Sequence, residues 1–162
     1  MQRRTFLGLS RLLAALLPLS IFRPAWSAPE TFEVTHSDAE WRKLLPGPAY
    51  RVLREEDTER PFTSPLLEEH RAGRFACAGC ALPLFSSETK FDSHTGWPSF
   101  WKPLPGAITR REDTSLGMVR VEVHCRRCGG HQGHVFEDGP KPTGLRYCIN
   151  GLALTFQPGA TA

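Results

Sequence analysis

The stretch Cys125-Arg126-Arg127-Cys128 repeats the spacing of Cys77-Ala78-Gly79-Cys80, and these two cysteine pairs decide how the chain folds. Two residues between two thiolates let one tight turn present both sulfurs to a single ion, and two such turns complete the tetrahedral shell that zinc accepts. Glycines at positions 79, 129 and 130 supply the backbone freedom that such turns need. The sequence therefore predicts one zinc ion bound by all four cysteines.

Other uses of the two pairs stay open at this point. They could form two disulfides, which suit an exported protein. One pair could instead be redox-active, and four thiolates also suit iron. Residues 81–124 separate the pairs, which is more than in a usual zinc ribbon but compatible with two hairpins that meet in space. Structural zinc contributes on the order of 10–16 kcal/mol of folding free energy, which would offset a small core.

A fifth cysteine, Cys148, is left over in the run Arg146-Tyr147-Cys148-Ile149-Asn150. An odd cysteine in an exported protein is an intermolecular bridge, an inert buried thiol or a reactive one. The neighbouring arginine favours the reactive thiol, because a nearby cation lowers the pKa of a cysteine. His131 and His134 lie in a glycine-rich segment just after the second cysteine pair and are candidate site residues. Four thiolates already close the metal shell, so these histidines are not needed as ligands.

Trp97-Pro98-Ser99-Phe100-Trp101 is a further unusual run. Two tryptophans that bracket a proline could belong to the core. They could equally form a rigid apolar wall that holds a methyl or thioether group. The residues by themselves do not decide between these two uses.

The N-terminus has the features of an export signal. Arg3-Arg4-Thr5-Phe6-Leu7 precedes an apolar run that reaches Ile21, and Ala25 and Ser27 are small residues suited to a cleavage site. Paired arginines fit the twin-arginine signal, which exports folded proteins. We expect residues 1–27 to be a signal peptide and the mature protein to be periplasmic or otherwise exported.

An uncleaved membrane anchor is the alternative, but Arg11 and Pro18 suit a spanning helix poorly. Removing the signal also changes the charge balance. Four of the 20 basic residues lie within residues 1–27, which leaves 16 basic against 17 acidic residues in the mature chain. This balance gives no support to nucleic-acid binding.

We expect residues 28–36 to be an extended linker and residues 37–158 to form one domain. Ser37-Asp38-Ala39-Glu40 is a capping box, in which serine and glutamate satisfy free amides at a helix start. Three short helices are predicted: one through Trp41, Leu44 and Leu45 that ends at Pro46-Gly47-Pro48, one over 49–54, and one over 64–70 with Gly73 as its stop.

From Phe75 onward the pattern is typical of strands and turns. Met118–Val123 alternates apolar with polar or charged residues, as a half-buried strand does, and Leu152–Phe156 is a predicted closing strand. Asp138-Gly139-Pro140 and Pro142-Thr143-Gly144 are turn signals. The expected fold is mainly β, with a short helical lead-in and antiparallel strands.

Together these motifs resemble those of the B-type methionine sulfoxide reductases, over about residues 38–156. The runs that carry the resemblance are Cys77-Ala78-Gly79-Cys80, Lys90-Phe91-Asp92-Ser93, Gly96-Trp97-Pro98-Ser99-Phe100, Cys125-Arg126-Arg127-Cys128, Gly129-Gly130-His131-Gln132-Gly133-His134-Val135-Phe136, Asp138-Gly139-Pro140, Pro142-Thr143-Gly144 and Arg146-Tyr147-Cys148-Ile149-Asn150. The resemblance implies two antiparallel β-sheets with short peripheral helices and one tetrathiolate zinc away from the chemistry. It also implies reduction of the R epimer of methionine sulfoxide, in proteins and as the free amino acid, which repairs oxidative damage.

The resemblance further implies roles for the matching positions. They are the nucleophile Cys148, the histidines His131 and His134, the thiolate-stabilising Arg146, the supporting Asp138 and Asn150, and the substrate contacts Trp97 and Phe136. The nucleophile would attack the sulfoxide sulfur and take up the oxygen as a sulfenic acid, and methionine would be released. The histidines would bind and protonate the oxygen. The chemistry is consistent with this, because the S–O bond breaks readily only if the oxygen gains a proton.

Three positions depart from the family pattern. Many members carry a recycling cysteine where this chain has Thr95, and threonine cannot form the internal disulfide. His94 stands where glycine is expected, and Gly151 where serine is frequent. Because the internal thiol is missing, an external thioredoxin-like thiol donor is expected. The enzyme is expected to be a monomer. The rival interpretations are a zinc ribbon that only binds a partner and a thiol–disulfide oxidoreductase that uses one Cys-x-x-Cys pair.

Overall fold

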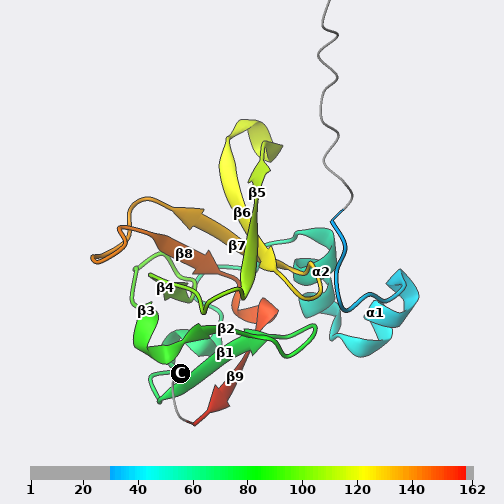
Figure 1. Ribbon diagram of the computed structural model, residues 1–162, viewed down its shortest axis with the longest axis horizontal. Coiled ribbons are helices and arrows are strands. Elements are labelled where there is room, and N and C mark those ends of the chain that lie inside the picture. Colours follow the sequence, from blue (N-terminus) through cyan, green and yellow to red (C-terminus); the bar gives the residue numbers. More distant parts are fainter. Residues whose placement is uncertain (1–29, 160–162) are drawn as a thin grey trace, which may run out of the picture. The chain divides into compact units, whose positions relative to one another are not determined.

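The computed structural model describes residues 30–159 (Figure 1). The expected signal peptide, residues 1–27, lies outside the described residues. Within the described part, no helix is long and apolar enough to cross a membrane. Residues 30–36 carry no helix or strand, but Val34 donates its amide to the carbonyl oxygen of Arg127 at 2.9 Å. The segment that leads into the domain is therefore held against the second cysteine turn.

Helices occupy only the first part of the domain. The capping box is confirmed: Ser37 accepts a bond from the amide of Glu40 and Glu40 caps the amide of Ser37. It starts helix α1 (Asp38–Leu44). Helix α2 (Gly47–Glu55) follows directly, and Pro48 lies in its first turn, where a proline is well tolerated. Trp41 is buried, whereas Leu44 is 59% exposed at the end of α1.

The third predicted helix is largely wrong. Only the 3-10 turn η1 (Pro65–Glu68) forms within residues 64–70. Gly73 does not stop a helix but begins strand β1, where a side chain would overlap the backbone of Gln157 on the neighbouring strand. The glycine is needed for close strand packing.

Two antiparallel sheets make up the rest, which confirms the expected fold class. The smaller sheet has the order β2 (Pro83–Ser86), β1 (Gly73–Cys77), β9 (Leu154–Pro158). The larger sheet has the order β3 (Lys90–Phe91), β4 (Ser99–Phe100), β8 (Arg146–Ile149), β7 (His131–Phe136), β6 (Arg120–Cys125), β5 (Ile108–Asp113). Short 3-10 turns lie at Ser87–Thr89 (η2), Ser115–Gly117 (η3) and Gly151–Ala153 (η4).

A group of aromatic rings joins the two sheets. Phe85 of β2 stacks on Phe100 of β4 with ring centroids 4.3 Å apart, and Phe75 of β1 meets the same ring edge-on at 5.0 Å. All three side chains are fully buried, so each contributes a few kcal/mol of apolar burial to the free energy of unfolding. Tyr147, the residue before Cys148, also packs on Phe85. The core thus reaches the strand that carries the left-over cysteine.

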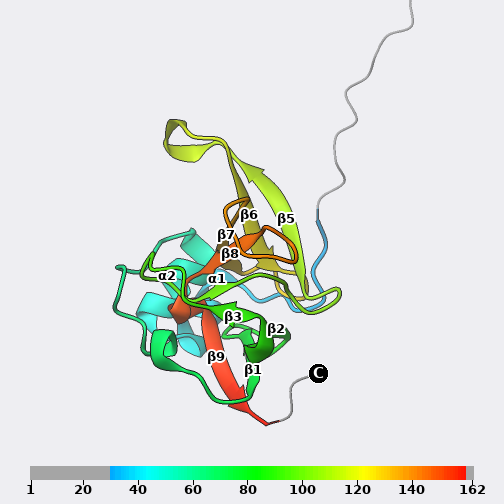
Figure 2. The ribbon, with the colours of Figure 1, turned by 90° about the vertical axis from the view of Figure 1, so that its left-hand side faces the viewer.

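The alternation over Met118–Val123 predicted the wrong buried face for most of its length. Val119 is 78% exposed and Val121 is exposed too, whereas Glu122 is buried. The hairpin of β5 and β6 projects from the body (Figures 1 and 2), and Val119 and Val121 are exposed on it, whereas Val123 is buried. Burial of Glu122 is compensated by polar partners, which belong to the site described below. The closing strand begins two residues later than expected and runs over Leu154–Pro158, because η4 occupies the first residues of the predicted strand.

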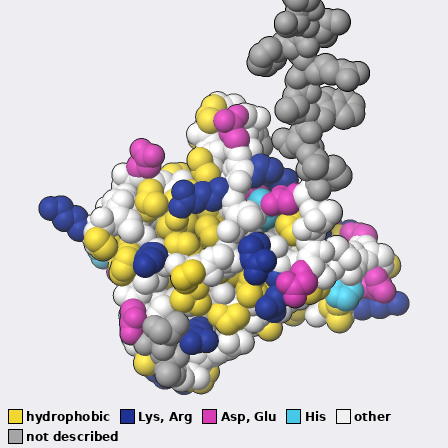
Figure 3. Space-filling model, in the orientation of Figure 1, with side chains coloured by type: hydrophobic (Ala, Val, Ile, Leu, Met, Phe, Trp, Pro, Cys, Tyr) yellow, Lys and Arg dark blue, Asp and Glu magenta, His cyan; other side chains and the backbone are white. Residues whose placement is uncertain are grey.

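The charged side chains do not gather by sign on the face that Figure 3 shows, where dark blue and magenta atoms are interspersed with hydrophobic ones.

Candidate active site

The four paired cysteines come together in one cluster. Their sulfur atoms all lie within 4.8 Å of one another, with Cys77 and Cys128 3.6 Å apart and Cys80 and Cys125 3.5 Å apart. Four sulfurs at about 2.3 Å from a tetrahedral zinc would be roughly 3.8 Å apart, so the cluster could hold a zinc ion. The separations are far longer than the ~2 Å of a disulfide bond. Cys77 ends a strand of one sheet and Cys125 ends a strand of the other.

The fifth cysteine lies elsewhere. Cys148 is half-buried on β8 and lines a cavity of about 130 Å³. None of the clustered cysteines lines this cavity, which Thr58 and Arg120 border. Of the residues that the sequence singled out, the cavity brings together Trp97, His134, Phe136, Cys148 and Asn150.

Strand pairing explains how these side chains meet. Cys148 is directly opposite His134 in the β7–β8 pair, and Arg146 is opposite Phe136. Opposite residues in an antiparallel pair, and residues two apart along a strand, share one face of the sheet. The two strands approach so closely that a side chain at Gly133, which has φ of 150°, would overlap the carbonyl oxygen of Cys148.

The environment of Cys148 has opposing effects on its thiol. Burial raises the pKa of Cys148, while the Thr95 hydroxyl, 3.9 Å from the sulfur, and the Arg146 guanidinium lower it. Arg146 is fixed by a double hydrogen bond to Asp138, with both distances 2.8 Å, and lies over the ring of Phe136. Asp138 is largely exposed and does not line the cavity, so it acts on the thiol through the arginine.

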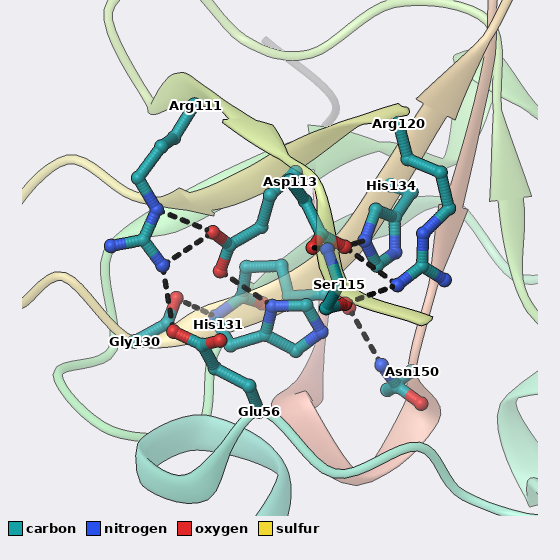
Figure 4. Close-up of polar contacts among 11 residues, drawn as sticks. Glu56, Arg111, Asp113, Ser115, Arg120, Gly130, His131, His134 and Asn150 are labelled. Carbon is teal, nitrogen blue, oxygen red and sulfur yellow. Dashed lines mark hydrogen bonds and ion pairs between the residues drawn. The ribbon is translucent and has the colours of Figure 1, made fainter. Parts of the chain in front are cut away.

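Each of the two site histidines forms a hydrogen bond with a carboxylate (Figure 4). His134 Nε2 lies 2.8 Å from Asp113, which also pairs with Arg120 at 2.6 Å. Burial lowers the pKa of His134, against the opposing effect of the Asp113 carboxylate. At neutral pH this favours a neutral imidazole whose Nε2–H donates to the Asp113 carboxylate. Asp113, at the end of β5, is thus a site residue.

His131 lies one layer deeper and does not line the cavity. Its Nδ1 is 2.7 Å from Glu122, both side chains are buried, and its ring centroid is 5.5 Å from that of His134. Burial alone would raise the pKa of Glu122, but His131 and Arg111 outweigh it and the pKa is lowered. Arg111 forms an ion pair with Glu122 at 2.6 Å and a second ion pair with Glu56 (Figure 4). His131 Nε2 has no hydrogen-bond partner among the described residues.

A residue that nothing in the sequence marked ties the cavity wall together. The carbonyl oxygen of Glu59 accepts a bond from the Trp97 indole at 3.1 Å, and its amide donates to the Asn150 side chain at 3.0 Å. Its buried carboxylate accepts bonds from the amides of Gly151 and Leu152. Burial raises the pKa of Glu59 against these two bonds. The hydrogen bonds connect three chain segments far apart in sequence.

The three departures from the family pattern have distinct structural settings. His94 has φ of 57°, the left-handed region in which glycine is more common, so its position shows why glycine is expected there. A side chain at Gly151 would overlap the hydroxyl of Ser64, which accounts for the glycine in this chain. Thr95 lies against Cys148, where a recycling cysteine would be close enough to react.

Comparisons with known proteins agree on one family. A profile of the SelR domain matches residues 45–158. The chain is 54% identical over 127 residues to the peptide methionine sulfoxide reductase MsrB of Agrobacterium fabrum, covering 78% of this chain and 94% of that protein. The MsrB of Thiobacillus denitrificans is 55% identical over 123 residues, covering 75% and 93%. That of Leptospira interrogans is 50% identical over 127 residues, covering 78% and 97%.

The setting of Cys148 predicts a pH effect. Arg146→Met removes the cation that lowers the Cys148 pKa, so the pKa should rise further and less thiolate should be present at neutral pH. The rate of Cys148 alkylation by iodoacetamide, followed by mass spectrometry of its peptide, should shift to higher pH. Arg42→Met, on the exposed face of α1, is the control and should leave the profile in place. A profile unchanged in Arg146→Met would contradict the assigned role.

Proposed function

The chain belongs to the MsrB family of peptide methionine sulfoxide reductases, and from this we propose that Cys148 is the nucleophile with which it reduces the R epimer of methionine sulfoxide. The enzyme converts methionine-R-sulfoxide to methionine. The observation that carries the residue assignment is the cavity in which a half-buried thiol, an imidazole and an indole face one another. The substrate's sulfur and oxygen must contact the first two of these groups together.

The reaction follows from these groups. The Cys148 thiolate attacks the sulfoxide sulfur, and the oxygen is then transferred to the cysteine sulfur as the sulfur–oxygen bond of the substrate and the transient sulfur–sulfur bond break, which leaves Cys148 as a sulfenic acid. The oxygen needs a proton for this step, and neutral His134, directly across the strand pair from Cys148, is placed to take the proton of the thiol and pass it to the oxygen. The Trp97 ring packs against the methyl group and so distinguishes the two epimers. Cys148 is oxidised, and methionine is released.

Regeneration requires thiols from another molecule. The chain has five cysteines, four of which lie in the cluster, and Thr95 stands beside the sulfenic acid where an internal thiol would be needed. One external thiol forms a mixed disulfide with Cys148 and releases water, and a second thiol frees the enzyme. We assign this step to a thioredoxin-like donor.

The cluster is proposed to bind one structural zinc ion. Its four sulfurs have the separations that tetrahedral zinc requires, and it joins the ends of β1 and β6 from different sheets. Bound zinc would fasten the two sheets where they meet. Cys77, Cys80, Cys125 and Cys128 are the proposed ligands.

The place of action is proposed from the N-terminus. A twin-arginine signal over residues 1–27 would carry the folded, metal-loaded protein out of the cytoplasm, so its thiol donor would be an exported thioredoxin-like domain acting on a monomer. Fractionation of cells that express the full chain, compared with an Arg3-Arg4 to Lys-Lys variant, tests this proposal. Export of both forms would contradict the twin-arginine route.

Zinc removal should weaken the fold. Cys77→Ser and Cys128→Ser should each lose the metal and lower the melting temperature by ten degrees or more, on the order of what loss of structural zinc implies. Elemental analysis and thermal unfolding measure both effects. Cys148→Ser is the matched control and should keep metal and melting temperature, because it lies outside the cluster. A metal-free variant with the wild-type melting temperature would rule out the structural role.

The two epimers of the substrate give the test of function. With dithiothreitol as reductant, the R epimer should be reduced and the S epimer should be at least roughly a hundredfold slower, because one wall of the cavity is a fixed indole. Cys148→Ser should abolish turnover, since a serine hydroxyl stays protonated near neutral pH. Comparable rates on both epimers would overturn the stereochemical argument, and activity within tenfold of wild type in Cys148→Ser would reject the nucleophile.

A single turnover without reductant tests the regeneration scheme. The Cys148 peptide should gain one oxygen and react with dimedone, because no free thiol of the chain lies beside it. In Thr95→Cys the same turnover should give a disulfide between positions 95 and 148 instead, since the side-chain atoms already lie 3.9 Å apart. A disulfide from Cys148 to a clustered cysteine in the wild-type chain would contradict the scheme.

A further inference from the structure

A second, larger cavity shares a wall with the proposed active site. It has a volume of about 380 Å³ and, like the smaller cavity, is lined by Trp97. Phe91 of β3 and Pro98 add apolar surface to it. A substrate side chain that reaches Cys148 therefore places its neighbours in the chain beside this second cavity. No step of the proposed reaction uses it.

An exposed aromatic residue lies at the rim of this second cavity. Phe62 is 70% exposed and has φ of 62°, a conformation that is unfavourable for a bulky residue. Its amide donates to the carbonyl oxygen of Gly96 at 2.8 Å, which fixes it beside the residue that precedes Trp97. With Phe91 and Trp97, which line the same cavity, Phe62 forms one apolar surface, and contiguous exposed apolar surface is typical of a binding site.

The charges of the cavity have an acidic excess. Its lining includes the carboxylates of Glu68, Glu69 and Asp92 against the ammonium group of Lys90. Glu69 is already engaged by a double hydrogen bond with Arg71, and Lys90 donates to the carbonyl oxygen of Leu67.

The other two carboxylates are open to solvent. Glu68 is 89% and Asp92 73% exposed, and among the described residues each has only a histidine within salt-bridge distance, His70 at 3.6 Å and His94 at 3.0 Å. An aromatic surface with carboxylates at its edge suits a long aliphatic side chain that ends in a cation.

We propose that this cavity binds a lysine or arginine side chain that flanks methionine sulfoxide in an oxidised polypeptide. The aliphatic stem packs on Phe62 and Phe91, and the cation lies near Glu68 and Asp92. This deepens the proposed function and rests on it, because the polypeptide is placed by its sulfoxide at Cys148. It assigns the enzyme a substrate class, polypeptides with a basic residue next to the damaged methionine.

Matched peptides test the proposal on the full-length protein with dithiothreitol. Each carries one methionine-R-sulfoxide and has lysine, alanine or glutamate at the positions one and two residues away on either side. At low salt, kcat/KM for the best lysine peptide should exceed that for its glutamate counterpart by roughly fivefold or more, as exposed charge pairs allow. The preference should shrink at high salt. Equal values for all three residues at every position would overturn the proposal.

Two variants test whether Phe62 and Glu68 cause the preference for lysine peptides. Phe62→Ala should lower kcat/KM for the lysine peptide, relative to that for free methionine-R-sulfoxide, by about tenfold. Glu68→Gln should reduce the lysine-over-glutamate preference. Leu44→Ala, an equally exposed apolar position outside the cavity, is the control and should change neither ratio. If Phe62→Ala lowers kcat/KM equally for the peptide and the free R epimer, the subsite is wrong. If wild type reduces neither the peptides nor the free R epimer, the proposed function itself fails.

Discussion

The close approach of β7 to β8 is the constraint on which the site depends. Gly133 leaves no room between its backbone and the carbonyl of Cys148, so the two strands pair at a fixed register. That register puts an imidazole directly opposite the thiol and an arginine two residues from it on the same face. A shift by one residue would turn every one of these side chains to the other face of the sheet. The pairing of the β7 and β8 backbones thus sets the positions of the catalytic side chains.

Buried charges hold the remaining parts in place. Asp113 and Glu122 orient the two histidines, and each carboxylate is shared with an arginine, Arg120 or Arg111. A buried carboxylate without such partners would be costly, which explains why the exposed hairpin that supplies them keeps its polar face toward the body. Glu59 has no arginine partner within the described part of the chain and accepts bonds from backbone amides instead. The site is therefore braced from several segments that are distant in sequence.

Much of this arrangement could be predicted from the sequence, and the reason differs between residues. The cysteine cluster and the capping box depend on short spacings, which a linear pattern records directly. Cys148 and His134 stood out by their neighbours in the sequence, whereas the roles of Phe136 and Asn150 were recognisable only through the family resemblance, and the structure then placed all four at one cavity with Trp97. Glu59 and Asp113 could not be found, because their roles arise from contacts across the fold. The burial of Glu122 was missed because alternation alone does not tell which side of a projecting hairpin is covered.

The tight packing at Gly151 links this position to one almost ninety residues earlier. A serine there would collide with the hydroxyl of Ser64, which also caps η1 by accepting a bond from the amide of Leu66. Neither position can change alone without loss of packing or of the cap. The two positions are therefore energetically coupled, so the cost of a substitution at one of them depends on the residue at the other.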